Sequence, residues 1–263
     1  MPRYKLTIEY DGMPYCGWQR QKGAYSVQEA LETAIKRLSQ EDVRLTAAGR
    51  TDAGVHAYGQ VVHVDLCADW LKGQSFNENF SDKKNRLCAG LNAHLQCMGE
   101  KISVLSAREV SKDFDARFCA TKRHYLFRIL NRFTPPVLES ERVWWVKQPL
   151  CVSAMQAGAR YLIGKHDFTT FRASQCQALS PVRSLDLLEI EQRGEYIEIR
   201  AQAPSFLHHQ IRSIVGSLVE VGRGRYAPIH MKHILEACDR KACGQVAPPY
   251  GLYFLRVDYD NEV

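Results

Sequence analysis

Residues Gly49–His56, with the sequence GRTDAGVH, form a predicted turn between two strand-like runs. Apolar alternation over residues 60–66 predicts a strand after the turn, and residues 43–46 predict one before it. Glycines on both sides allow a sharp bend and the close approach of a ligand. We therefore expect Asp52 to stand at a loop tip, beside the guanidinium of Arg50, a group suited to phosphate. Taken alone, an Asp-x-Gly sequence indicates only a turn, so the rest of the chain must decide what this loop does.

The first half of the chain has further strand and helix signals around this turn. Apolar and polar residues alternate over residues 3–10, which predicts a strand. Ser26–Glu29 has the pattern of a helix capping box, and apolar residues at helical spacing follow it as far as Leu38. A short helix over residues 84–95 and a strand from residue 102 are expected to complete this half.

The second half repeats the mixture of strands and helices. The predicted elements are a strand at 125–130, a helix at 152–163 ended by Gly164, strands at 184–192 and 196–202 around a hairpin turn, helices at 207–218 and 229–238, and a strand at 252–259. This order predicts an α+β fold of two ferredoxin-like modules, residues 1–112 and 113–263. Their antiparallel sheets are expected to join into one large sheet flanked by helices.

Composition narrows the class of protein. The chain has 263 residues and a formal net charge of +6, a mild basic excess that suits a polyanionic partner. Basic residues lie beside aromatic ones at residues 17–22 and 116–118, a mixture suited to phosphate contact and base stacking. Nine cysteines without paired metal-ligand spacing indicate reduced thiols, and no run of about 18 apolar residues could span a membrane. We expect a soluble, cytoplasmic protein.

Over nearly its whole length the chain resembles the tRNA pseudouridine synthase A family. The matching segments, in chain order, are Tyr10–Gly12 with Gly17–Gln19, Gly49–Ala57, Phe114–Phe118 with Tyr125, His166–Phe168, Phe206–Arg212 and Gly251–Tyr253. Each segment alone is weak, but their order across the chain is specific. The sequence departs from the family pattern at Phe127, where a second tyrosine is common, and at residues 96–101, which lack a Pro-Asp pair.

The resemblance assigns the catalytic roles to three residues. Asp52 matches the reactive carboxylate, Arg212 its partner cation, and Tyr125 the aromatic ring that receives the flipped base. Read without the family, Arg212 would be a solvent-facing helical arginine and Tyr125 a core aromatic on the face of Phe127. The residues expected to contact RNA, besides Tyr125, are Arg50, Arg20, Lys22, Arg117 and His208.

The function implied is isomerisation of uridine at positions 38, 39 and 40 in the anticodon stem-loop of tRNA. Asp52 would form an adduct with C6 of the base or C1′ of the ribose, and the sequence does not choose between them. No metal and no cofactor are expected. The resemblance also implies a homodimer in which one tRNA touches both protomers. The polar segment 67–85 is either an RNA-contacting loop or plain surface.

Two alternatives are kept. One is an RNA-binding protein that has this fold but no catalysis, and retention of all three catalytic residues argues against it. The other is a metal-dependent nuclease or phosphohydrolase using Asp52 with His166 and Asp167, which lacks further ligands at helical spacing. His208 and His209 are expected to lie on a helix and to point apart, which disfavours a shared metal ion.

Overall fold

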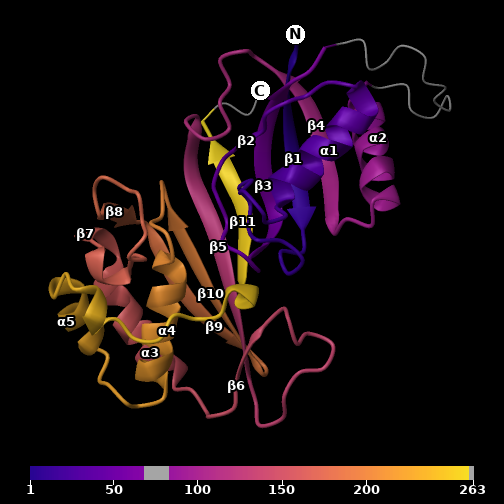
Figure 1. Ribbon diagram of the computed structural model, residues 1–263. Coiled ribbons are helices and arrows are strands. Elements are labelled where there is room, and N and C mark those ends of the chain that lie inside the picture. The colour runs from indigo at the N-terminus through magenta and orange to yellow at the C-terminus, as the bar shows by residue number, and fades with distance from the viewer. Residues whose placement is uncertain (68–82, 261–263) are drawn as a thin grey trace. The chain divides into compact units, whose positions relative to one another are not determined.

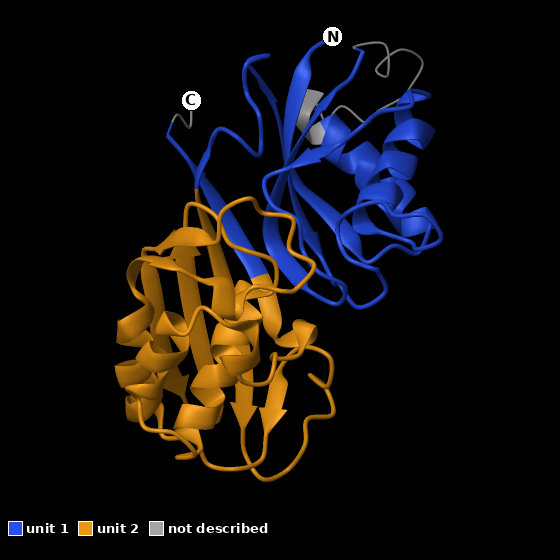
Figure 2. Ribbon diagram, turned by 60° about the vertical axis from the view of Figure 1, so that its left-hand side comes forward, with its two compact units in different colours: residues 1–121, 254–263 blue, residues 122–253 orange. Residues whose placement is uncertain are grey.

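The computed structural model describes residues 1–67 and 83–260, as two compact units (Figure 1). Unit 1 comprises residues 1–121 and 254–263, and unit 2 comprises residues 122–253 (Figure 2). Most of the polar segment 67–85 lies outside the described residues, so its role stays a prediction. Among the described residues, no helix has both the length and the apolar character needed to cross a membrane.

Unit 1 is a sheet with two helices against it (Figure 1). Its elements are β1 (Arg3–Tyr10), α1 (Val27–Ser39), β2 (Thr46–Ala47), β3 (His56–Asp65), α2 (Lys83–Cys97) and β4 (Ile102–Val110). The strands pair antiparallel in the order β4-β1-β3-β2. That order, with one helix after the first strand and one after the third, is the split arrangement of a ferredoxin-like module. β11 (Leu252–Tyr259) returns to this unit and pairs with β3.

Local sequence explains these elements. The side chains of Leu6 and Ile8 on β1 are fully buried, as the alternation predicts. The backbone N–H of Glu29 donates to Ser26 Oγ at 3.2 Å, which fixes the start of α1. The helix then buries one apolar face that ends at Leu38.

Unit 2 has its own largely antiparallel sheet, with α3 and α4 packed together and α3 against β9. Its elements are β5 (Ala120–Asn131, from residue 122), β6 (Trp144–Val146), α3 (Val152–Ala159), β7 (Gly164–Asp167), β8 (Val182–Leu185), β9 (Leu187–Arg193), β10 (Tyr196–Ala203), α4 (Gln210–Gly222) and α5 (His230–Glu236). The strand order is β5-β10-β9, β6 runs parallel to β5, and β7 pairs with β8 separately. The expected α+β class, a large sheet flanked by helices, is confirmed.

Three predicted elements of unit 2 need correction. The helix expected at 152–163 ends as an α-helix at Ala159 and continues as a 3₁₀ turn to Leu162. The strand expected at 184–192 is two strands, β8 and β9, which are separated at Asp186, whose N–H donates to the Gln202 carbonyl at 2.8 Å. The helix expected from residue 207 starts at residue 210. Gly216 on α4 packs closely against the segment after α5, since a Cβ there would lie 1.6 Å from the Gln245 carbonyl oxygen.

Candidate active site and nucleic-acid contacts

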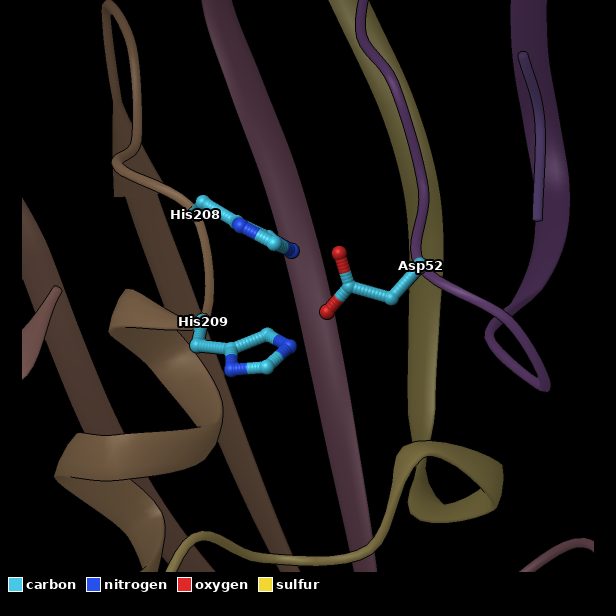
Figure 3. A group of neighbouring side chains, drawn as sticks. All are labelled: Asp52, His208 and His209. Carbon is cyan, nitrogen blue, oxygen red and sulfur yellow. The ribbon is translucent and has the colours of Figure 1, made fainter. Parts of the chain in front are cut away.

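The Asp52 turn joins β2 to β3 in unit 1. The N–H of Val55 donates to the Asp52 carbonyl at 3.2 Å, which closes the turn. The Asp52 side chain is partly exposed, and its carboxylate extends away from the ribbon of the loop (Figure 3). Arg50, two residues earlier, is exposed. The turn therefore presents a carboxylate and a cation, as the sequence predicts.

Buried polar side chains of β1 and β3 form hydrogen bonds with this turn. The hydroxyls of Tyr10 and Thr51 form a hydrogen bond of 2.8 Å, and both residues are buried. The amide of Gln60, with no exposed surface, donates to the Gly49 carbonyl at 2.7 Å. Burial raises the pKa of Tyr10 to about 12, so its phenol stays neutral and can donate or accept. The residues just before Asp52 are thus fixed by side chains from β1 and β3.

A second loop, residues 11–26, packs against the Asp52 turn through its glycines. The N–H of Trp18 donates to the Thr51 carbonyl at 3.0 Å. Gly17 has φ of +90°, and a Cβ on it would lie 2.7 Å from the Thr51 oxygen and 3.1 Å from the nitrogen of Ala53. A Cβ on Gly12 would meet the Val55 oxygen at 2.0 Å. Sequence reasoning included both glycines in the family resemblance but gave them no such role.

The same loop is anchored at its other end by Glu100. Its carboxylate accepts a hydrogen bond from Tyr15 at 2.7 Å and a short one from Tyr25. Burial and the adjacent carboxylate raise the pKa of both phenols, so they remain donors at neutral pH. The N–H of Lys101 donates to the Tyr15 hydroxyl at 2.9 Å. Sequence reasoning missed this anchor, because Glu100 lies 75 residues or more from its partners.

In unit 2, Tyr125 lies on β5 and is 9% exposed. Its ring meets Phe206 edge to face, with 5.2 Å between the ring centroids. Phe127, two residues along the strand, is fully buried. Phe206 belongs to the matched segment that ends at Arg212, so the structure brings two parts of the family pattern together within unit 2.

Arg212 lies in the first turn of α4 and is tied to the segment after α5. Its Nε donates to the Ala247 carbonyl at 2.8 Å, and the Ala247 N–H donates to the Arg212 carbonyl at 3.0 Å. Arg212 is therefore not the solvent-facing helical arginine that a reading without the family would predict.

The prediction that His208 and His209 point apart is wrong. Both precede α4, and their ring centroids lie 4.2 Å apart (Figure 3). His209 adopts a left-handed conformation with φ of 64°, so helical spacing does not apply to the pair. His208 is exposed, as an RNA contact must be.

The predicted RNA contacts differ in how they are paired. Lys22 and Arg117 are exposed. Arg20 is half exposed and has carboxylate oxygens of both Glu29 and Glu32 at 3.5 Å. Part of its charge is thus already balanced, which sequence alone did not reveal.

His166 and Asp167, the pair considered for metal binding, make local hydrogen bonds in unit 2. His166 Nε2 is 2.9 Å from the Ile163 carbonyl oxygen, and Asp167 accepts the N–H of Thr169 at 2.8 Å. These contacts hold the start of β7 and the turn after it.

Comparison with known proteins identifies relatives along almost the entire chain. The family model described as tRNA pseudouridine synthase matches residues 6–118 and 159–260. A protein named tRNA pseudouridine synthase A from Brucella anthropi is 54% identical over 259 residues, 98% of each chain, and one of the same name from Brucella ovis is 53% identical over the same share. Among solved structures, a chain in a crystal structure of a Cbf5-Nop10-Gar1 complex matches 97% of this chain and 50% of its own length, with 11% identity and a TM-score of 0.38.

Proposed function

The chain belongs to the tRNA pseudouridine synthase family, and from that premise we propose that it isomerises uridine to pseudouridine at positions 38, 39 and 40 in the anticodon stem-loop of tRNA. The observation that carries the proposal is Asp52, a partly exposed carboxylate whose flanking residues are fixed by buried hydrogen bonds and by the close approach of Gly17. A single positioned carboxylate is what this reaction requires.

The chemistry is balanced without a redox partner. The bond between ribose C1′ and base N1 breaks, a bond between C1′ and C5 forms, N1 gains a proton and C5 loses one. Asp52 acts as the nucleophile, adding to C6 of the base or to C1′ of the ribose, and both routes remain open. The detached base rotates before C5 bonds. We propose that no metal and no cofactor take part.

We propose that Tyr125 receives the flipped base. An aromatic face stabilises a base that has left its stack. A Tyr125→Phe variant separates two roles, since it keeps the ring and removes the hydroxyl. If the ring alone matters, turnover is retained. If the hydroxyl handles the C5 proton, proton release slows while the affinity for tRNA is unchanged.

We propose that Arg212 is the cation that keeps Asp52 ionised and oriented. Arg212→Ala is expected to reduce kcat far more than tRNA affinity. Because the guanidinium also donates to Ala247, the free energy of unfolding must be measured in the same variant. An equal loss of affinity and rate would make Arg212 a phosphate contact instead.

The proposed RNA contacts are Arg50, Arg20, Lys22, Arg117 and His208. A cation that contacts phosphate contributes about 0.7–0.9 to the slope of log affinity against log salt concentration. Lys22→Ala is expected to flatten the slope by about that amount. Arg20→Ala should change it less, because Glu29 and Glu32 lie 3.5 Å away. An unchanged slope for Lys22→Ala would place that residue off the RNA path.

We also propose a homodimer in which one tRNA contacts both protomers. Analytical ultracentrifugation at the concentration of the activity assay tests this. A monomer with full activity would overturn the dimer and leave the isomerase proposal intact.

The deciding experiment is tritium release from tRNA labelled at C5 of uridine, with EDTA present. The wild type should release tritium and Asp52→Asn should not. Asp42→Asn is the matched control, since Asp42 is an exposed carboxylate of the same unit that pairs with Lys36 Nζ at 2.8 Å. Tight tRNA binding without any release would favour the inactive RNA-binding alternative, and release that EDTA abolishes would favour metal chemistry.

A further inference from the structure

The turn between β4 and β5 presents an aromatic ring to solvent. Phe118 is 80% exposed. The guanidinium carbon of Arg117 lies 5.4 Å from the centroid of that ring. Proteins that bind single-stranded nucleic acid combine exposed aromatic rings with cations, because the ring stacks on an unpaired base and the cation attracts the phosphate.

The backbone that carries Phe118 is fixed. Asp115 Oδ1 accepts the N–H groups of Arg117 at 2.8 Å and of Phe118 at 2.9 Å. The N–H of Cys119 donates to the Asp115 carbonyl at 3.0 Å. A ring held on a fixed turn loses little conformational entropy when it binds, so more of its contact energy appears as affinity.

The sheet of unit 1 holds the same turn from behind. The Ala116 N–H donates to His63 Nδ1 at 3.0 Å, and the Tyr259 hydroxyl donates to the Ala116 carbonyl at 2.8 Å. Burial lowers the pKa of His63, so the imidazole stays neutral and its Nδ1 can accept. Arg3 Nη1 donates to the Phe114 carbonyl at 2.9 Å. Three strands of unit 1 thus support the turn.

The position of His63 shows how far the ring lies from Asp52. β3 starts at His56, directly after the Asp52 turn, and seven residues separate His56 from His63. At about 3.3 Å per residue the strand spans roughly 23 Å between them. Phe118 is therefore too far away to touch the reacting uridine.

We propose that Phe118 is a stacking contact for an unstacked base of the tRNA outside the reacting nucleotide, with Arg117 beside it for the adjoining phosphate. This inference rests on the proposed function for the identity of the RNA. It assigns Phe118 to affinity and not to the chemical step.

The test compares wild type, Phe118→Ala and Phe118→Trp by filter binding and by tritium release. It uses full-length tRNA and a hairpin cut so that it ends closer to the target uridine than the roughly 23 Å spanned by β3. Phe118→Ala should raise Kd for full-length tRNA roughly 5- to 150-fold, the range for one base stacked on an aromatic ring. It should leave kcat within about twofold, and Phe118→Trp should retain the affinity. On the hairpin all three proteins should bind alike.

Phe133→Ala is the matched control. Phe133 is 72% exposed and has Lys147 Nζ 4.1 Å from its ring centroid, so it resembles Phe118 in exposure and in its cation. Phe133 does not belong to the turn that Asp115 and the sheet of unit 1 hold in place, so if that turn is what contacts the RNA, the Kd of Phe133→Ala for tRNA should equal that of the wild type. An affinity loss equal to that of Phe118→Ala would show only a general effect of exposed aromatic surface and would overturn the inference.

Three other results would overturn it as well. The first is a Kd of Phe118→Ala for tRNA equal to that of the wild type, with kcat also unchanged. The second is the same unchanged Kd with a lower kcat. The third is a change in the sedimentation of Phe118→Ala without RNA, which would make Phe118 a contact between copies of the chain. Urea unfolding checks that each variant is folded. If the wild type releases no tritium, the proposed function fails, and the binding comparison still decides the role of Phe118.

Discussion

Replacing Gly17 by alanine should displace the Asp52 turn and slow the chemical step. Gly17 has φ of +90°, where a side chain costs about 1–3 kcal/mol in stability. The new Cβ would lie 2.7 Å from the Thr51 oxygen, against about 3.4 Å for an ordinary contact. The turn must therefore move by roughly 0.7 Å at the residue before Asp52. A displacement near 1 Å can cost about a hundredfold in rate, so we expect kcat to fall roughly 10- to 100-fold.

Gly23→Ala separates the displacement from the backbone cost. Gly23 also has a positive φ, of +77°, but a Cβ there would meet nothing within 4 Å. Gly17→Ala should lose more stability in urea than Gly23→Ala, because only its Cβ meets backbone atoms, and only Gly17→Ala should lose kcat in single-turnover tritium release. Equal kcat values in the two variants would refute the idea that close packing at Gly17 positions Asp52.

Three more predictions concern stability in urea. Gly216→Ala should lower the free energy of unfolding by at least ~3 kcal/mol, because its Cβ would lie 1.6 Å from a carbonyl oxygen. Gly224→Ala places its Cβ in open space and should lower it by about 1 kcal/mol. Equal losses in the two variants would contradict the close contact at Gly216. Tyr10→Phe and Thr51→Val should each cost about 1–3 kcal/mol, and the double variant clearly less than their sum, since each single change removes the same hydrogen bond between two buried hydroxyls. Strict additivity would argue against that hydrogen bond. The pKa of His63 is lower in the folded protein, so the unfolded chain binds more protons and the free energy of unfolding should fall as pH drops below about 6.5. His63→Asn should flatten this dependence on pH measurably. An unchanged slope of the free energy of unfolding against pH would show that His63 is not responsible.

Much of the fold was predictable because its signals are local. The alternation over residues 3–10 and 252–259 depends only on neighbours in the chain, and β1 and β11 appear there. The hydroxyl of Ser26 and the amide of Glu29 are three residues apart, so the start of α1 could also be read directly. Where one pattern of apolar residues continues along a whole helix or strand, the sequence is sufficient to predict that element.

The errors arose where distant contacts override the local pattern. The strand expected over 184–192 is interrupted at Asp186, whose N–H pairs with the distant carbonyl of Gln202. His209 takes a left-handed conformation that no sequence rule assigns to histidine, so α4 begins later than its apolar spacing suggests.

The candidate site shows the same division. Asp52 and Arg50 were found because they adjoin one another in a short turn. The groups that support them, such as Gly17 and Tyr10, lie more than 30 residues earlier, so their roles depend on the folded chain. Sequence identified the reactive groups, and the structure was needed to identify what holds them.

The return of β11 to unit 1 has a consequence for synthesis on the ribosome. Residues 1–121 carry the Asp52 turn, and their strand β3 pairs with β1 and β2 within that stretch. Its further partner, β11, is available only when residues 254–259 have emerged from the exit tunnel. Unit 2 is a continuous stretch that is translated earlier than that last strand. Vectorial folding can thus complete the sheet that carries the Asp52 turn only after β11 has been translated, and a nascent chain that stalls before that point would leave the edge of β3 open to a chaperone or to another strand.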